Sequence, residues 1–134
     1  MAKQFTLGKN ERLKSRKSIE QLFNEGKKIN LSPYLIYFIS SPITGDLNGF
    51  PIQFGVGVAT RNFKKAVDRN RIKRVTKEAY RLQKIPLQEK LQKKNIRLNL
   101  FFIYTAKELP EYNEVYKQME VVLKKIETII DEIR

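Results

Sequence analysis

The sequence predicts an α+β fold in which helices pack on a four-stranded sheet. Three observations support this prediction. Residues 52–59 alternate between apolar and small or polar side chains, which is typical of a half-buried strand. Residues 63–84 and residues 111–133 instead carry apolar side chains at helical spacing. No linker or repeat separates these elements, so we expect one domain that spans residues 1–134.

The N-terminal half begins with a short helix, which we expect over residues 15–25. Ser15 belongs to a residue type that caps helix N-termini, and Gly26 favours termination. β-branched and aromatic residues then dominate residues 28–40. This composition predicts strand, which we expect to be split near Pro33 because proline cannot donate a ladder hydrogen bond.

The remaining elements follow from turn signals and periodicity. Residues 40–51 contain three turn signals and predict a loop. We expect a Lys-rich connection containing Pro86 between the helix at residues 63–84 and a strand at residues 97–105. The order is then α-β-β-β-α-β-α. The buried stripe of the last helix is predicted to consist of Val115, Met119, Val122, Ile126, Ile129 and Ile133.

The composition excludes several kinds of catalytic site. The chain has no His and no Cys, which removes the commonest general base and the usual activated nucleophiles. Paired carboxylates could still hold magnesium, but the composition argues against a self-sufficient enzyme. No apolar run is long enough to span a bilayer. The charged N-terminus lacks a secretory signal, so we expect a cytoplasmic location and no membrane partner.

The net charge of +13 is unevenly distributed along the chain. The basic excess lies in residues 1–101, whereas residues 102–134 contain more acidic than basic residues. Basic charge concentrated in one part of a small domain favours a polyanionic partner. The alternative is a solvated surface that serves only solubility.

The helix expected over residues 63–84 has two different faces when it is projected at about 100° per residue. Its apolar arc consists of Ile72, Val75, Ala79 and Leu82. Its cationic arc consists of Arg69, Asn70, Lys73, Arg74, Lys77, Arg81 and Lys84. Like charges along one helix face repel each other, and this cost is tolerable where phosphates neutralise them. A nucleic-acid-binding face is therefore predicted; a merely solvated face would usually intersperse Glu with Lys.

The same segment carries a family resemblance. Residues 66–81, AVDRNRIKRVTKEAYR, resemble the RNR signature of the bacterial ribonuclease P protein family, approximately A-V-x-R-N-x-x-K-R-x-x-R-E-A-x-R. Lys77 stands where the family usually has Arg. The resemblance extends over the rest of the chain, beginning at Glu11–Leu13. It implies a left-handed β-α-β crossover, whereas general rules predict a right-handed one.

The resemblance also implies a function. The chain would be the protein component of a ribonucleoprotein that removes the 5′ leader of precursor tRNA by endonucleolytic cleavage. Its partners would be the catalytic RNA subunit and precursor tRNA. Mg²⁺ would be held mainly by the RNA subunit and the substrate, and no catalytic residue is expected in the protein. The alternatives are a ribosomal or other structural RNA-binding protein, and a nuclease that acts alone.

Two sets of binding residues are implied by the resemblance. The RNA-subunit site would consist of Lys64, Lys65, Arg69, Asn70, Arg71, Lys73, Arg74, Lys77 and Arg81. The 5′-leader site, between the first helix and the sheet, would consist of Ile19, Phe23, Tyr37, Thr60 and Arg61. Bases stack on aromatic rings with little regard to sequence, which suits leaders that differ between tRNAs. Two departures weaken this second site, because Ile19 replaces a common Phe and Thr60 replaces a common Lys. The residues alone, without the resemblance, favour ordinary core positions for Phe23 and Tyr37.

Overall fold

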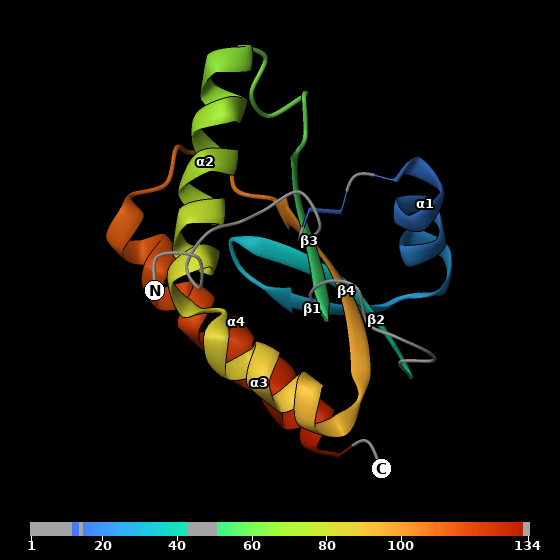
Figure 1. Ribbon diagram of the computed structural model, residues 1–134. Helices are drawn as coiled ribbons and strands as arrows, with labels where there is room; N and C mark the ends of the chain where they lie inside the picture. The colour runs from blue at the N-terminus through green and yellow to red at the C-terminus, as the bar shows by residue number, and fades with distance from the viewer. Residues whose placement is uncertain (1–11, 14, 43–50, 133–134) are drawn as a thin grey trace.

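The computed structural model describes residues 12–13, 15–42 and 51–132. Its elements are α1 (Arg16–Glu25), β1 (Lys27–Leu31), β2 (Tyr34–Pro42), β3 (Ile52–Val58), α2 (Ala66–Gln83), α3 (Ile85–Lys94), β4 (Ile96–Tyr104) and α4 (Tyr112–Asp131). The predicted α+β class is confirmed, and the predicted order holds apart from the additional helix α3 (Figure 1). Within the described residues, no helix combines the length and apolarity that a membrane crossing requires.

The sheet has the strand order β1-β2-β4-β3. β2 pairs antiparallel with both β1 and β4, and β4 pairs parallel with β3. The predicted split near Pro33 is confirmed, since the cis peptide Ser32–Pro33 lies in the turn between β1 and β2. The parallel pair β3–β4, with α2 and α3 between its strands, forms a β-α-β unit. The left-handed sense that the resemblance implies for this crossover stays a prediction.

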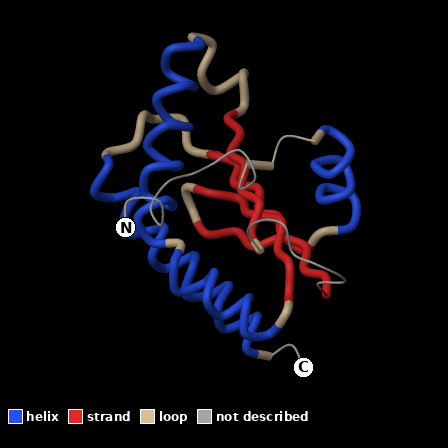
Figure 2. Tube along the Cα trace, in the orientation of Figure 1, coloured by secondary structure: helices blue, strands red, loops and turns tan. Residues whose placement is uncertain are grey.

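Helices lie on both sides of the sheet. α1 lies on one side, and α2, α3 and α4 lie on the other (Figures 1 and 2). The main core forms on the side of α2 and α4, where Phe54, Leu100 and Phe102 of the sheet are buried. In α4 the predicted stripe is confirmed for Val115, Met119, Val122 and Ile126, Leu123 and Ile130 are also buried, and Ile129 is only half-buried. Ile133 lies outside the described residues.

The connection predicted around Pro86 is instead the helix α3. Pro86 occupies the first turn of this helix, where its missing N–H leaves no hydrogen bond unmade. Leu87 and Leu91, one helical turn apart, are both fully buried. Asn95 ends the helix in the left-handed conformation with φ 55°. Proline was therefore a start signal here rather than a loop signal.

α2 begins at Ala66, three residues later than predicted. Phe63 lies in the preceding loop with only 6% of its surface exposed, and its ring centroid is 6.0 Å from that of Tyr104. This burial ties residue 63 to the sheet. The helix therefore starts only after Lys65, whose extended backbone forms the N-cap.

The buried face of α2 is rotated relative to the predicted arc. Ile72 and Ala79 are buried as predicted, but Leu82 is exposed and Val75 is half-buried. Thr76 and Tyr80 complete the buried face. The Tyr80 ring stacks on that of Phe54, with centroids 4.0 Å apart and an interplanar angle of 5°.

A buried hydrogen-bond chain fastens α2 to β2. The Thr76 hydroxyl donates to the Ile72 carbonyl at 2.8 Å, so the Tyr34 hydroxyl, 2.6 Å from Thr76 Oγ1, acts as the donor to it. Burial raises the pKa of Tyr34 to about 12, because the phenolate would lose its hydration. The neutral phenol is thus the form that the folded protein holds.

Replacing Tyr34→Phe is expected to lower the free energy of unfolding by about 1 kcal/mol at neutral pH, since one buried hydrogen bond is lost. Chemical denaturation monitored by circular dichroism measures this change. The raised pKa of Tyr34 also stabilises the native protein below pH 10, and this contribution is lost as the pH rises from 10 to about 12. The wild type should therefore lose more stability than the variant across that window. Equal losses would contradict the assignment.

Candidate nucleic-acid interface

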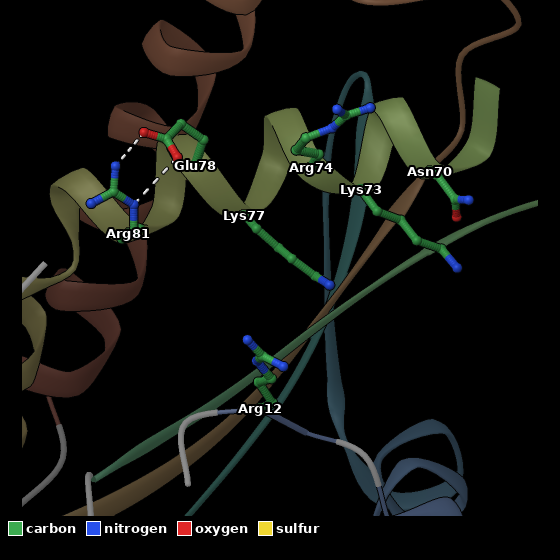
Figure 3. Close-up of a pocket in the computed structure, with 7 residues that line it drawn as sticks. All are labelled: Arg12, Asn70, Lys73, Arg74, Lys77, Glu78 and Arg81. Atoms are coloured by element: carbon green, nitrogen blue, oxygen red, sulfur yellow. Dashed lines mark hydrogen bonds and ion pairs between the residues drawn. The ribbon is translucent and has the colours of Figure 1, made fainter. Parts of the chain in front are cut away.

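A groove runs along the exposed side of α2. We call it the basic groove, and its lining residues are Arg12, Asn70, Lys73, Arg74, Lys77, Glu78 and Arg81 (Figure 3). It includes five of the nine residues expected to bind the RNA subunit. Lys73 and Lys77 extend from the helix toward the side on which Arg12 lies (Figure 3). Cations thus line the groove from two separate segments, an arrangement that suits a phosphate backbone.

Arg12 reaches the basic groove through backbone pairing. Arg12 forms an isolated parallel bridge with Phe54, and Leu13 N donates to the Phe54 carbonyl at 2.8 Å. Leu13 is buried, which anchors this segment along the outer edge of β3. Arg12 could not be assigned to a site from the sequence, because its position depends on strand pairing. The only available signal was its place in the Glu11–Leu13 part of the resemblance.

One end of the basic groove carries an acidic residue. This residue, Glu78, forms an ion pair with Arg81 (Figure 3). The hydrogen bond from Arg81 to Glu78 is the main cause that raises the pKa of the guanidinium. Both side chains are partly exposed, so the pair adds little stability. It does reduce the positive charge at this end, and the Asn70–Lys77 part remains the more strongly basic one.

Arg69 occupies a different place from the one its cationic arc suggested. Its guanidinium Nη1 donates to the carbonyl oxygens of Phe63 at 2.8 Å and of Lys64 at 2.9 Å. Arg69 therefore braces the loop before α2 and does not line the basic groove. Lys64 and Lys65 in that loop are exposed.

Two further cations near α2 also lie apart from the groove lining. Arg71 is exposed but is not among the residues that line the groove. Lys84, which the helix projection placed on the cationic face, is buried with 1% of its surface exposed. The predicted cationic arc is thus narrower than the projection indicated.

Aromatic side chains gather on the other face of the sheet, beneath α1. Phe23 of α1 lies 4.8 Å from Tyr37 and 5.5 Å from Phe101, measured between ring centroids. We call these three residues the ring cluster. Phe23 keeps 42% of its surface exposed, and the Lys28 ammonium lies 6.0 Å from the Tyr37 ring centroid. The structure brings Phe23 and Tyr37 together as expected, and Ile19 is half-buried on the same helix.

Phe101 was missed by the sequence analysis. It is the strand partner of Tyr37 on one side and of Gly55 on the other. Gly55 and Gly57 leave space on this face of the sheet, and the Phe101 ring fills that space. A Cβ atom at Gly55 would lie 2.8 Å from Cδ2 of Phe101 and 3.2 Å from the Leu13 carbonyl oxygen. The glycines therefore accommodate Phe101.

Thr60 and Arg61 are exposed and follow the C-terminal end of β3. They lie between that strand and the loop at Phe63 that leads into α2. In the chain, Thr60 and Arg61 therefore lie between β3, which forms part of the face that carries the ring cluster, and α2, which lines the basic groove.

The described part of the chain contains no group of three or more acidic, His or Cys side chains that could hold a metal ion. We therefore assign no Mg²⁺ site to the described residues. An Mg²⁺ ion held mainly by RNA stays a prediction.

Comparison with known proteins gives a consistent result. The family model described as Ribonuclease P matches residues 7–127. The ribonuclease P protein component of Porphyromonas gingivalis is 36% identical over 123 residues, which cover 91% of this chain and 87% of that protein. The ribonuclease P protein component of Chlorobaculum tepidum is 30% identical over 105 residues, covering 75% and 68% respectively.

Solved structures share the fold. The ribonuclease P protein of Staphylococcus aureus superposes with a TM-score of 0.66 at 19% identity, covering 88% of this chain and 96% of that one. The Thermotoga maritima protein gives a TM-score of 0.65 at 22% identity, covering 86% and 96%. At these identities the structures establish the fold alone. The match of the family model and the identity with the curated relatives establish that this chain belongs to the ribonuclease P protein family.

Proposed function

We propose that this chain binds the catalytic RNA subunit of ribonuclease P through the basic groove and the 5′ leader of precursor tRNA through the ring cluster. The observation that carries the proposal is the basic groove, in which Arg12 lies opposite the cations of α2. In a member of this family, such a groove suits the phosphate backbone of a folded RNA. The ring cluster lies on the opposite side of the sheet, so both RNAs can be bound at once.

Each surface contributes a different physical effect. Lys73, Arg74 and Lys77 neutralise phosphates and release counterions, which gives salt-dependent affinity. Phe23 offers a ring on which a leader base can stack, worth about 1–3 kcal/mol per base. Mg²⁺ bound by the RNA would supply the activated water that attacks the phosphodiester. The protein's residues bind and orient the RNAs and screen their charge, in keeping with a chain that lacks His and Cys. A cytoplasmic location follows as an expectation.

The decisive experiment adds the purified chain to its cognate RNA subunit at low Mg²⁺ and measures leader removal from precursor tRNA. We expect the protein to stimulate cleavage that the RNA alone performs slowly. Absence of stimulation, together with co-sedimentation with ribosomes, would favour the ribosomal alternative. Cleavage by the protein without RNA would show a nuclease that acts alone.

The two surfaces should respond differently to substitution. Lys73→Ala combined with Arg74→Ala is expected to weaken RNA-subunit binding. It should also reduce the slope of the logarithm of the binding constant against the logarithm of the salt concentration, by roughly 0.7–0.9 for each lost phosphate contact. Phe23→Ala is expected to weaken binding of leader-bearing precursor about tenfold and to leave mature tRNA unaffected. Titrations at several salt concentrations measure both effects. Lys125→Ala, an exposed charge on α4, is the control. Identical behaviour of the groove and ring variants would contradict the two-surface proposal.

Arg69 should act through the loop that it braces. Arg69→Ala is expected to weaken RNA-subunit binding because Lys64 and Lys65 lose their fixed position. A double-mutant cycle with the Lys64→Ala, Lys65→Ala pair should show coupling of about 0.5 kcal/mol or more, whereas a cycle with Arg74→Ala should be additive. Direct phosphate contact by Arg69 would instead give additivity in both cycles.

A further inference from the structure

The face of the sheet beneath α1 changes in chemistry from one end to the other. Strand register places its side chains in rows that cross β2, β4 and β3. The first rows are apolar and aromatic, and include the Tyr37–Phe101–Gly55 row of the ring cluster. The next row contains the two amides Asn99 and Gln53. In chain order along β2, β4 and β3, the rows are Leu35–Ile103–Gly57, Tyr37–Phe101–Gly55, Ile39–Asn99–Gln53 and Ser41–Arg97.

The last two rows form a depression that shares no lining residue with the basic groove or the ring cluster. We call it the polar pocket, and its lining residues are Ser18, Ile39, Ser41, Gln53, Arg97 and Asn99. Ser18 comes from α1 and the other residues come from three strands, so the framework of the pocket is regular secondary structure. Gln53 and Asn99 are half-buried and Arg97 is exposed. Their side chains make no hydrogen bond or ion pair to another residue that the structure describes.

These groups match the parts of one nucleotide. The side-chain amides of Asn99 and Gln53 each present both donors and an acceptor, as the edge of a base does. The Arg97 guanidinium suits a phosphate. Protein side chains read RNA sequence mainly on single strands, whose base edges are free. The pocket begins one row beyond the rings of Tyr37 and Phe101, where a stacked strand would continue.

We propose that the polar pocket binds a further nucleotide of the single-stranded 5′ leader, with Arg97 on a phosphate and Asn99 and Gln53 on the edge of the base. This inference rests on the proposed function of the ring cluster. It differs in chemistry, because stacking tolerates any base whereas amide hydrogen bonds depend on which base is present. The pocket would thus add a base preference to a surface that otherwise lacks one.

The geometry also predicts a dependence on leader length. Thr60 and Arg61 follow β3 at the Gly57–Ile103 end of the sheet, and Arg97 lies at the opposite end. Along β4 the six steps from Ile103 to Arg97 span about 20 Å at roughly 3.3 Å per residue. A leader that enters from the side of Thr60 and α2 must cross the ring cluster before it reaches the polar pocket. Short leaders therefore cannot reach Arg97.

The test measures the affinity of the holoenzyme for precursor tRNAs whose leaders increase by one nucleotide at a time. Arg97→Ala is expected to weaken binding roughly five- to tenfold above a threshold length and to change it less than about twofold below that length. Above the threshold it should also lower the salt slope by roughly 0.7, the value for one contact to a single strand. Arg97→Lys should restore most of the phosphate contact. Asn99→Ala should reduce the effect of changing the base at the threshold position.

Two controls separate this inference from the proposed function. Lys125→Ala removes an exposed charge from α4, on the other side of the sheet, and should show no length dependence. Phe23→Ala should weaken binding already at leader lengths below the Arg97 threshold. Suppose that Phe23→Ala gives this result, but Arg97→Ala and Asn99→Ala either weaken binding by the same factor at every leader length or do not weaken it at all. The polar pocket is then not a leader site, although the proposed function stands. If Phe23→Ala also shows no leader dependence, both proposals fail. Arg97 and Asn99 variants that do not fold would equally overturn the pocket, since these side chains would then serve the fold.

Discussion

The arrangement of this protein depends on how α2 is fastened to the sheet. The Phe54–Tyr80 stack, at 4.0 Å and 5°, and the hydrogen bond from Tyr34 to Thr76, at 2.6 Å, fix both the position and the rotation of the helix. A rotation by one residue, about 100°, would turn the buried Tyr80 ring toward solvent and cations toward the core. Burying an unpaired ammonium or guanidinium group costs far more than the mutual repulsion of exposed cations on one helix face. The core therefore forces Lys73, Arg74 and Lys77 outward, and the basic groove is a consequence of apolar packing as much as of charge.

Most of the fold could be predicted from the sequence because its elements carry strong local signals. Alternation identified β3, helical spacing identified α4, and Ser15 and Gly26 marked the ends of α1. The structure confirms the cap directly, since the Ser15 side chain accepts a hydrogen bond from Ser18 N.

The predictions failed where a local signal had two physical meanings. Pro86 breaks a helix interior but is well tolerated in a first turn, so α3 was taken for a loop. Thr76 and Tyr80 were not part of the predicted apolar arc, because their partners, Tyr34 and Phe54, lie on distant strands. That burial rotated the inward face of α2 away from the predicted arc.

In the candidate site, too, the residues placed by local sequence could be predicted, whereas those placed by contacts outside the local sequence could not. A helix projection needs only the local sequence, and it identified Asn70, Lys73, Arg74, Lys77 and Arg81 correctly as neighbours on one surface. It could not show that Arg69 turns back to the carbonyl oxygens of its own preceding loop, or that Glu78 pairs with Arg81 in the groove. Arg12 and Phe101 could not be predicted for a different reason.

Each is placed by strand pairing, Arg12 through the bridge to Phe54 and Phe101 through its register with Tyr37. Register joins residues that are far apart in sequence, and a single sequence contains no direct record of it.

The short edge strand β3 couples the two surfaces mechanically. Phe54 points into the core and supports Tyr80 of α2, whereas the next residue, Gly55, points to the other face and lies beneath Phe101. Successive residues of a strand always face opposite sides, so the offset between the basic groove and the ring cluster is set by one strand rather than by a hinge or a loop. The Leu13 segment, hydrogen-bonded to Phe54 along the free edge of β3, adds Arg12 to the same rigid unit. A one-residue slip of β3 would exchange its two faces, removing the support of α2 and the space for Phe101 in one step. For the proposed binding of a folded RNA and a single strand, the pleat of the sheet would set the relation between the two sites directly.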